Sequence, residues 1–463
     1  MAVSVPRAGL VPVTLTDQGN AELFVTLYGR SFRYIEDHGW YRWSGWRWEL
    51  DEDDRVLWAV GDFAESLAEV DPAGRHTKIE LRRNRWRAMS TVGMKAILAH
   101  AKDAPGIPLP VSLLDADVQV LCTPMGVVNL LTGRVIPPDP THHHHSRTTS
   151  VPPADMPTPR WYRFLTDTFG DDAEGIRMIT YVQELLGSSV AGDVDAQVIP
   201  FLYGKGKNGK SVLLDVVIRL LGDYADAAPP DFLMTQPSQG HPLDLAELHG
   251  RRIVACSEIR PGDSYDEARV EVLTGGNTIK ARRLRQGSFS FRPTHTLWLI
   301  GNHKPEPGVG GRVFANRLRV IPFERVPADS YKIDNLAEDL VKEEGPGILQ
   351  WLISGAHRYL NGTRVLTGPN NGGTSPGRWH TQEDDALDRF LDECCILSAP
   401  LRVEQTLLYS TYHAWCRAEG TVPQTSRSFA ARVRNIVGLS TPKEMILSNQ
   451  RKFYPGIGLA GGA

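Results

Sequence analysis

Two hydrophobic patterns alternate through the middle of the chain and predict strands that are followed by helices. A continuous apolar run at residues 198–203 predicts a buried strand, and apolar residues at helical spacing in 211–221 predict a helix that stops at Gly222. Further apolar runs at 252–258 and 296–302 predict two more buried strands. Strands that alternate with helices are typical of an α/β fold with a parallel sheet. We therefore predict a parallel-sheet domain in the middle of the chain.

The N-terminal third has a different pattern, rich in aromatic residues and short elements. Ser44-Gly45 predicts a tight hairpin, and four tryptophans bracket it: Trp40, Trp43, Trp46 and Trp48. We expect these rings to form the core of a small β-unit; the alternative is that they stack on nucleic-acid bases. Residues 62–102 are predicted to be helical, and residues 122–140 to form a strand–turn–strand unit.

The C-terminal part shows helical patterns followed by a short basic strand pair. The helical patterns cover 384–395, 405–417 and 426–437, and the strands lie around 445–447 and 453–454. Three helices followed by a hairpin are what a winged-helix DNA-binding domain would show. We predict such a domain over residues 378–463.

A phosphate-binding motif lies between the first predicted strand and its helix. It fits G-x-x-x-x-G-K-[ST], in which glycines let backbone N–H groups surround an anion and the helix N-terminus adds partial positive charge. Lys210 is predicted to reach the β- and γ-phosphates of ATP, and the Ser211 hydroxyl to ligate Mg²⁺. The predicted nucleotide-binding residues are Gly204, Lys205, Gly206, Lys207, Asn208, Gly209, Lys210, Ser211 and Val212.

Polar residues at the ends of the next strands complete a candidate ATPase site. Glu258 ends the second strand, where a carboxylate can polarise the attacking water and support Mg²⁺. Asn302 ends the third strand, where an amide can orient that water. Arg317 precedes a further strand and could stabilise transition-state charge on a neighbouring subunit's nucleotide. The alternative for Arg317 is an ordinary ion pair with a surface acid.

Charge is distributed unevenly, although the formal net charge is only −3. Between residues 277 and 320 the only acid is Glu306, against nine basic residues: Lys280, Arg282, Arg283, Arg285, Arg292, Lys304, Arg312, Arg317 and Arg319. So one-sided a run favours a polyanionic ligand such as a nucleotide or DNA over an ordinary solvated surface.

Cysteine usage and the absence of targeting signals indicate a soluble intracellular protein. The five cysteines are odd in number and form no CxxC pair, which argues against a disulfide framework or a zinc ribbon. No run approaches about 20 apolar residues, and no signal-peptide pattern opens the chain. We therefore expect a location in the cytoplasm of a bacterial host cell. Four histidines at 142–145 could bind a metal, but a Pro-rich tract offers no fixed geometry, and we expect no specific metal site.

Taken together, these motifs resemble the superfamily-3 helicases of phages, plasmids and phage satellites, the helicase part of primase–helicase replication proteins. The matching segments are 204–211, 248–258, 273–284, 289–305 and 316–323, with weaker similarity at 123–133, 415–416 and 454–457. Asn277, Glu271 and Asn316 depart from the family's usual residues. Larger relatives carry a primase–polymerase domain ahead of the segment that begins here near residue 16, so no primase activity is predicted for this chain.

The resemblance implies a ring, usually a hexamer, that encircles DNA and moves 3′→5′ along one strand. It implies a DNA-gripping β-hairpin before the third strand, with Lys280, Arg282, Arg283 and Arg285 as the DNA-binding residues. It also places the arginine finger at Arg317. Lys210, Glu258, Asn302 and Arg317 are the predicted catalytic residues, with Ser211 and Glu258 at the metal.

The predicted organisation is α/β, with an AAA+-like P-loop ATPase domain between two smaller parts. The segments are a flexible arm (1–15), an N-terminal α/β collar region (16–136), a Pro-rich linker (137–160), a helical collar segment (161–190), the ATPase domain (191–365) and the winged-helix domain (378–463). The predicted function is an ATP-dependent DNA helicase that acts on single-stranded and forked DNA, with a separate primase as a further partner. Two alternatives stay open: an origin-binding initiator that uses ATP only to assemble, and an ATPase that drives a partner.

Overall fold

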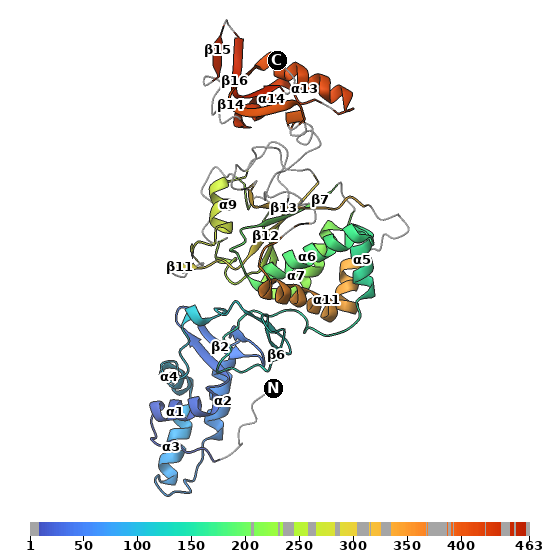
Figure 1. Ribbon diagram of the computed structural model, residues 1–463. Coiled ribbons are helices and arrows are strands. Elements are labelled where there is room, and N and C mark those ends of the chain that lie inside the picture. The colour runs from blue at the N-terminus through green and yellow to red at the C-terminus, as the bar shows by residue number, and fades with distance from the viewer. Residues whose placement is uncertain are drawn as a thin grey trace. The chain divides into compact units, whose positions relative to one another are not determined.

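The computed structural model describes most of the chain as two compact units, Met1–Pro376 and Gly377–Ala463 (Figure 1). The described residues are 9–204, 208–229, 232–234, 245–257, 265–282, 288–302, 314, 316–325, 335–366, 368, 387, 390–391, 393–421, 423–436, 445–448 and 451–459.

A five-stranded parallel sheet forms the centre of the first unit. Its strands are β7 (Ile199–Tyr203), β8 (Ala225–Ala227), β9 (Ile253–Ser257), β12 (Thr296–Gly301) and β13 (Leu318–Pro322), in the order β13-β7-β12-β9-β8. The prediction of an α/β fold with a parallel sheet is confirmed. The order also inserts β12 between β7 and β9, although β12 comes after both in the sequence.

Helices cover the sheet and share its core. They are α5 (Pro159–Phe169), α6 (Ala173–Ala191), α7 (Lys210–Leu221), α9 (Glu267–Thr274) and α11 (Leu336–Asn361), with a short 3-10 turn, η2, at Gly222–Tyr224. Buried side chains of α5, α6, α7 and α11 form one apolar cluster with residues of β7, β9, β12 and β13. Residues 161–190, which we expected to form a collar segment, thus pack directly in the core of the sheet.

The closest helix pair in this core is α6 with α11, and two glycines permit the approach. A Cβ on Gly187 would lie 2.2 Å from the Gly355 carbonyl carbon, and a Cβ on Gly355 would lie 2.4 Å from the Gln183 oxygen. The Gln183 side chain then joins the helices, donating from Nε2 to the Trp351 oxygen at 2.8 Å and accepting from Arg358 at 2.8 Å.

The N-terminal region combines small sheets with helices. It contains α1 (Asp17–Tyr28), β1 (Phe32–Ile35), β2 (Gly39–Trp43), β3 (Trp48–Leu50), α2 (Arg55–Ser66), α3 (Lys78–Met89), α4 (Thr91–Ala101), η1 (Val111–Leu113), β4 (Val120–Thr123), β5 (Gly126–Asn129) and β6 (Val135–Ile136). The hairpin predicted at Ser44-Gly45 joins β2 to β3. Trp48 is fully buried and Trp43 packs beside it, so the prediction of an aromatic core is confirmed for these two rings. Trp40 packs instead against the neighbouring helical cluster, and Trp46 against the core of the parallel sheet.

Side chains from the sheet domain hold the N-terminal region in place. The Tyr224 hydroxyl accepts a hydrogen bond from the Cys122 backbone N–H at 3.1 Å. Arg252, just before β9, is buried and donates from Nη2 to the Val118 oxygen at 3.0 Å. Burial lowers the pKa of this guanidinium, yet an arginine stays charged, so carbonyl acceptors stabilise it here.

Both segments predicted to be unstructured make ordered backbone contacts. In the Pro-rich linker, the Ser150 N–H donates to the Leu220 oxygen and the Ala154 N–H to the Pro346 oxygen, each at 3.0 Å. Within the predicted arm, the Leu10 oxygen accepts from the Ala68 N–H at 2.9 Å. Prolines remove donors from the linker, but several of its remaining N–H groups still find partners.

The four-histidine tract belongs to this packed linker. His143 offers its backbone oxygen to Trp48 Nε1 at 3.0 Å, and His142 bonds the Asp139 carboxylate at 2.8 Å through Nδ1. Burial lowers the pKa of His143, His144 and His145. Across the described residues, no three His, Cys, Asp or Glu side chains are grouped so as to hold a metal ion. The five cysteines are free thiols. Within the part of the chain that is described, no helix is both long and apolar enough to cross a membrane.

The second unit has its own core and a three-stranded antiparallel sheet. Its elements are β14 (Cys395–Glu404), α13 (Gln405–Ala418), α14 (Ser426–Ile436), β15 (Ile446–Ser448) and β16 (Arg451–Leu459), in the sheet order β14-β16-β15. Phe390, Tyr412, Phe429 and Tyr454 meet in the core. The helices at 405–417 and 426–437 were predicted, whereas β14 was not, because Pro400 and a register shift between Leu397 and Arg402 interrupt its pattern.

The α6–α11 contact predicts a cost for adding a single methyl group. Gly187→Ala should lower the free energy of unfolding by about 2–3 kcal/mol or more, because the new Cβ would overlap backbone that cannot rotate away. Gly61→Ala is the matched control: Gly61 lies inside α2, and its Cβ would meet only Met94 Sδ at 3.7 Å. Denaturant melts should show the control neutral or stabilised, as helix propensity predicts. Equal effects of the two changes would contradict the packing argument.

Candidate active site

The loop after β7 is bounded by two glycines that pack closely against other parts of the chain. At Gly204 a Cβ would lie 2.1 Å from Asn208 Nδ2 and 2.3 Å from the Phe323 oxygen, so only glycine fits. Gly209 has a left-handed φ of +92° and lies against the Phe164 ring of α5. Residues 205–207 of the predicted loop, Lys205, Gly206 and Lys207, lie outside the described residues.

Lys210 is the first residue of α7, and its ammonium group points into the mouth of this loop. Lys210 is buried, and its Nζ donates to the Gly204 oxygen, to Asn208 Oδ1 at 2.9 Å and to Asn302 Oδ1 at 3.3 Å. The structure therefore brings together the lysine predicted to hold phosphate and the asparagine predicted to orient water, although 92 positions separate them in the sequence.

Asn208 connects this lysine to a second strand. Its Oδ1 accepts from Lys210, and its Nδ2 donates to the Phe323 oxygen, just beyond β13. The Phe323 N–H in turn donates to the Tyr203 oxygen of β7 at 2.6 Å. The amide is buried, so its two hydrogen bonds fix the positions of both partners.

Of the other residues predicted at the carboxyl ends of the strands, the structure describes Ser211 and Val212 but not Glu258. Ser211 is exposed in the first turn of α7, and Val212 is half-buried beside it. Glu258 lies outside the described residues; it follows Ser257, the last residue of β9, which pairs with Ile300 of β12. The carboxyl ends of β7, β12 and β9 thus lie side by side, the position where open parallel sheets bind ligands.

A β-hairpin precedes β12, as the motifs suggested. It pairs β10 (Ile279–Arg282) antiparallel with β11 (Ser288–Phe291). In β10, Ile279 and Ala281 are buried while Lys280 and Arg282 are exposed. Arg283 and Arg285, the other two residues predicted to bind DNA, lie outside the described residues.

An aromatic cluster supports the base of this hairpin. The His249 ring lies edge-on to Phe289 and Phe291, with centroids 5.6 and 5.2 Å apart, and the two phenylalanines stack at 5.7 Å. His249 belongs to the segment just before β9, so its ring contacts attach the hairpin to the domain that contains the parallel sheet.

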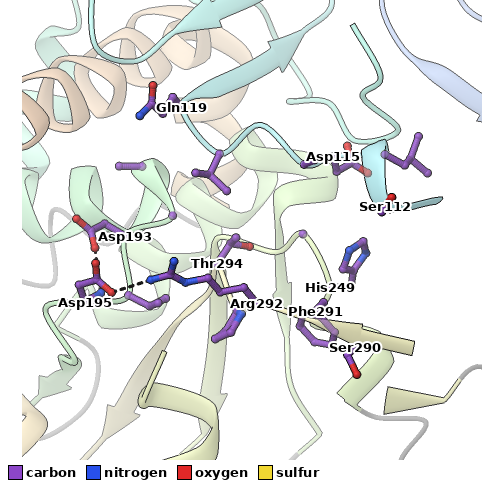
Figure 2. A pocket seen from close by; sticks show the side chains of 18 of the residues that line it. Ser112, Asp115, Gln119, Asp193, Asp195, His249, Ser290, Phe291, Arg292 and Thr294 are labelled. Atoms are coloured by element: carbon purple, nitrogen blue, oxygen red, sulfur yellow. Dashed lines mark hydrogen bonds and ion pairs between the residues drawn. The ribbon is translucent and has the colours of Figure 1, made fainter. Parts of the chain in front are cut away.

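A cavity of about 560 Å³ opens beside the hairpin base, at the amino ends of β7, β9 and β12. Figure 2 shows Arg292 bonded to Asp195 on one wall, with Ser112 and Asp115 of the N-terminal region across from them. The Arg292–Asp195 distance is 3.1 Å, but both side chains are largely exposed, so the ion pair contributes little to stability. This cavity is separate from the loop that holds Lys210.

Arg317 lies at the amino ends of the parallel strands, whereas the loop lies at their carboxyl ends. It precedes β13, whose first residue Leu318 pairs with Ile199 and whose last residue Pro322 pairs with Tyr203. Five residues of strand span about 16 Å, so Arg317 is far from the loop of its own chain.

Among the described residues, Arg317 donates hydrogen bonds to three acceptors and forms no ion pair. It donates to the Glu271 oxygen at 3.3 Å, to Thr274 Oγ1, and to Gln197 Oε1 at 3.2 Å. Burial lowers the pKa of this guanidinium, and the nearby Glu271 carboxylate partly offsets that effect. All three acceptors are uncharged groups of the same chain, and the Glu271 carboxylate affects Arg317 only through its charge.

Sequence reasoning missed the side-chain role of Asn208 and the support that His249 gives to the hairpin. Asn208 was assigned to the nucleotide through its place in the loop, whereas its amide also joins Lys210 to Phe323. No sequence signal reveals a backbone acceptor 115 positions away. The spacing of Phe289 and Phe291, on one face of a strand, could have indicated an aromatic partner.

Comparisons with known proteins give two family matches and three viral relatives. Residues 21–170 match the family described as D5 N terminal like, and residues 202–313 match a family of unknown function, DUF5906. The chain is 31% identical over 150 residues to "Putative helicase L207/L206" of Acanthamoeba polyphaga mimivirus, 23% over 304 residues to "Putative helicase 022R" of Frog virus 3, and 25% over 166 residues to "Putative helicase V13" of Sputnik virophage. The matches cover 32%, 62% and 34% of this chain, but only 15%, 31% and 21% of those relatives.

Among solved structures, the chain is similar to the C-terminal region of NrS-1. One apo form matches with a TM-score of 0.39 and 13% identity, over 67% of this chain and 77% of that one. Another matches with a TM-score of 0.35 and 16% identity, over 45% and 50%. The predicted resemblance is confirmed by the family and sequence matches: the chain is a relative of viral proteins that are named as helicases.

Proposed function

We propose that this chain is the subunit of a ring-shaped, ATP-dependent DNA helicase that unwinds DNA 3′→5′ during replication of a mobile genetic element. The observation that carries the proposal is the meeting of Lys210 Nζ and Asn302 Oδ1, 3.3 Å apart, at the mouth of a glycine-bounded loop. A cation for phosphate and an amide for water are two of the groups that phosphoryl transfer to water needs at one place.

The described residues fit an ATP triphosphate at this edge. The N-terminus of α7 is directed at the loop, and Gly209, the residue just before it, has a left-handed φ of +92°. Lys210 would exchange a protein acceptor for phosphate oxygen, while Asn302 holds the attacking water. The exposed Ser211 hydroxyl and Glu258 would hold Mg²⁺, which supplies charge neutralisation when bound.

DNA would contact the basic hairpin and the second unit. Lys280 and Arg282 project from one face of β10, and Arg283 and Arg285 follow them in the sequence. Their phosphate contacts would make affinity strongly dependent on salt. In the second unit, the order β14, α13, α14, β15, β16, with β16 in the middle of the sheet, supports a winged-helix domain for DNA or another replication protein such as a primase.

The position of Arg317 supports assembly into a ring. An arginine at the amino ends of the strands cannot reach a nucleotide bound at the carboxyl ends of the same sheet. It could contact the nucleotide of a neighbouring subunit whose loop lies against these amino ends. ATP would then be hydrolysed at subunit interfaces, in a ring that is predicted to be a hexamer.

The direct test of the proposal is Lys210→Ala in an assay that displaces one strand of a forked duplex with a 3′ tail. The change removes the charge at the loop and should abolish ATP turnover and unwinding, since transition-state charge would lose its fixed cation. Thermal melting should confirm an intact fold. If the wild-type protein binds the fork and hydrolyses ATP but displaces no strand, it is an assembly-type initiator rather than a helicase. ATP turnover that ignores single-stranded DNA would favour an ATPase that drives a partner.

The Asn208 contacts predict a graded pair of variants. Asn208→Ala removes an acceptor of a charged donor, an interaction of about 1.5–3 kcal/mol, and should lower kcat/KM for ATP by about 10- to 100-fold. Asn208→Asp keeps an acceptor for Lys210 but replaces the donor to Phe323 with a carboxylate oxygen and adds a negative charge where phosphate is proposed to bind, so it should lower kcat/KM further than the alanine change. Steady-state ATPase kinetics measure both. An alanine variant with wild-type kinetics would show that the amide does not position Lys210.

Arg317→Ala tests the ring. A finger supplied to a neighbour should leave ATP binding nearly normal and lower turnover by about 10³-fold or more. Mixing this variant with Lys210→Ala subunits should restore part of the ATPase activity, because an intact loop then meets an intact arginine at some interfaces.

Arg319→Ala is the matched control for this mixing experiment. Arg319 lies two positions further on and bonds the Asn316 and Leu318 oxygens. Mixed rings that co-assemble without recovery would exclude Arg317 as a finger supplied in trans. If Arg319→Ala is itself inactive and regains ATPase activity when mixed with Lys210→Ala subunits, the finger would be Arg319.

A further inference from the structure

Helix α3 of the N-terminal region presents a rigid face to solvent that the proposed ATPase site does not use. Leu81, Asn84 and Ala88 are its buried residues. Asn84 exchanges two hydrogen bonds with Asn20 of α1, at 3.1 and 3.0 Å, inside the core. A capping box between Thr77 and Glu80 fixes the start of the helix. The opposite face is therefore held in a defined orientation.

The exposed face carries a large aromatic ring. Trp86 is 76% exposed and Ile79 is 72% exposed. Seven positions, two helical turns, separate them, so they lie on the same side of the helix. Arg82 and Arg83 lie between them along the helix, and both are exposed. The apolar groups are thus interleaved with guanidinium groups and do not merge into one patch.

The same face is positively charged. In its sequence, KIELRRNRWRAM, α3 has five basic residues and one acid. Arg82 and Arg85 both pair with the single carboxylate of Glu69, at 3.0 and 3.1 Å. Arg87 pairs with Asp17 at 3.1 Å. Two arginines that share one carboxylate leave an excess of positive charge, and Arg82 still has 54% of its side chain exposed.

We propose that this face of α3 binds single-stranded nucleic acid, with Trp86 stacking on a base and Arg82, Arg83 and Arg87 contacting phosphates. Exposed aromatics set among basic residues are the platform that single strands use, since every base offers a π-face and every linkage a negative charge. Protein interfaces also use tryptophan and arginine, but they place them around a contiguous apolar centre, whereas on this face the large apolar side chains Ile79 and Trp86 are separated by Arg82 and Arg83. The inference goes beyond the proposed function and rests on it only in taking nucleic acid as the polyanion.

The test is oligonucleotide binding by the full chain, measured as the fluorescence anisotropy of a labelled oligo-dT. Trp86→Ala should raise Kd by about tenfold, and Trp86→Phe should recover most of that loss, because a phenyl ring still stacks. Arg83→Gln should lower the slope of log Kd against log salt by about one. Trp58→Ala is the matched control: Trp58 is a 67% exposed tryptophan of α2, in the same region, with Arg55 over its ring. It should leave Kd unchanged.

Two readouts separate this inference from the proposed function. ATP turnover without DNA should be normal in every α3 variant, whereas Lys210→Ala should lose turnover. An unchanged Kd in both Trp86→Ala and Arg83→Gln overturns the α3 site and leaves the ATPase proposal standing. An equal loss in Trp58→Ala overturns it as non-specific. A shift in assembly size for Trp86→Ala, seen by sedimentation, with Kd unchanged once assembly is matched, identifies the face as a contact between copies of the chain instead.

Discussion

The candidate site depends on one topological constraint, the insertion of β12 between β7 and β9. β12 is central, hydrogen-bonded along both edges, and nearly all of its side chains are buried. Trp298 anchors it from the helix side, donating from Nε1 to Ser189 Oγ of α6 at 3.0 Å. Because the strand cannot slide without breaking both ladders and this bond, its last residue is fixed. Asn302 follows it directly, and this places an amide beside Lys210.

The elements of the sheet domain could be predicted because their local signals agree. The strand at 199–203, its glycines and the helix at 210–221 each carry a pattern that needs no distant partner. The order of the strands could not be predicted in the same way, because β9 and β12 are both short buried runs whose sequences do not specify which strand they pair with. The same limit applies to β14, where Pro400 hides a strand that only pairing with β16 makes visible.

The candidate site was predictable as a set of residue types and only partly as a geometry. The motif identified Lys210 and Asn302, and the structure brings their side chains within hydrogen-bond distance. What the motif could not supply is the backbone acceptor at Phe323, because a carbonyl oxygen has no sequence signature. Arg317 shows the converse: its residue type suggests a finger, and only the register of β13 against β7 shows which edge of the sheet it occupies.

The register of β13 against β7 places one end of β13 beside α9 and the other end beside the loop that holds Lys210. Arg317 lies at its amino end, bonded to the helix α9 segment at Thr274, and Phe323 lies at its carboxyl end, bonded to Asn208 in the loop. A strand resists extension, since its length is fixed by covalent geometry and by the ladder beside it. Displacement of one end along the strand axis would therefore move the other end as well. If neighbouring subunits meet at the amino edge, β13 is the element that would carry the position of that contact to the loop that holds Lys210, and Asn208 is the bond through which the loop would respond.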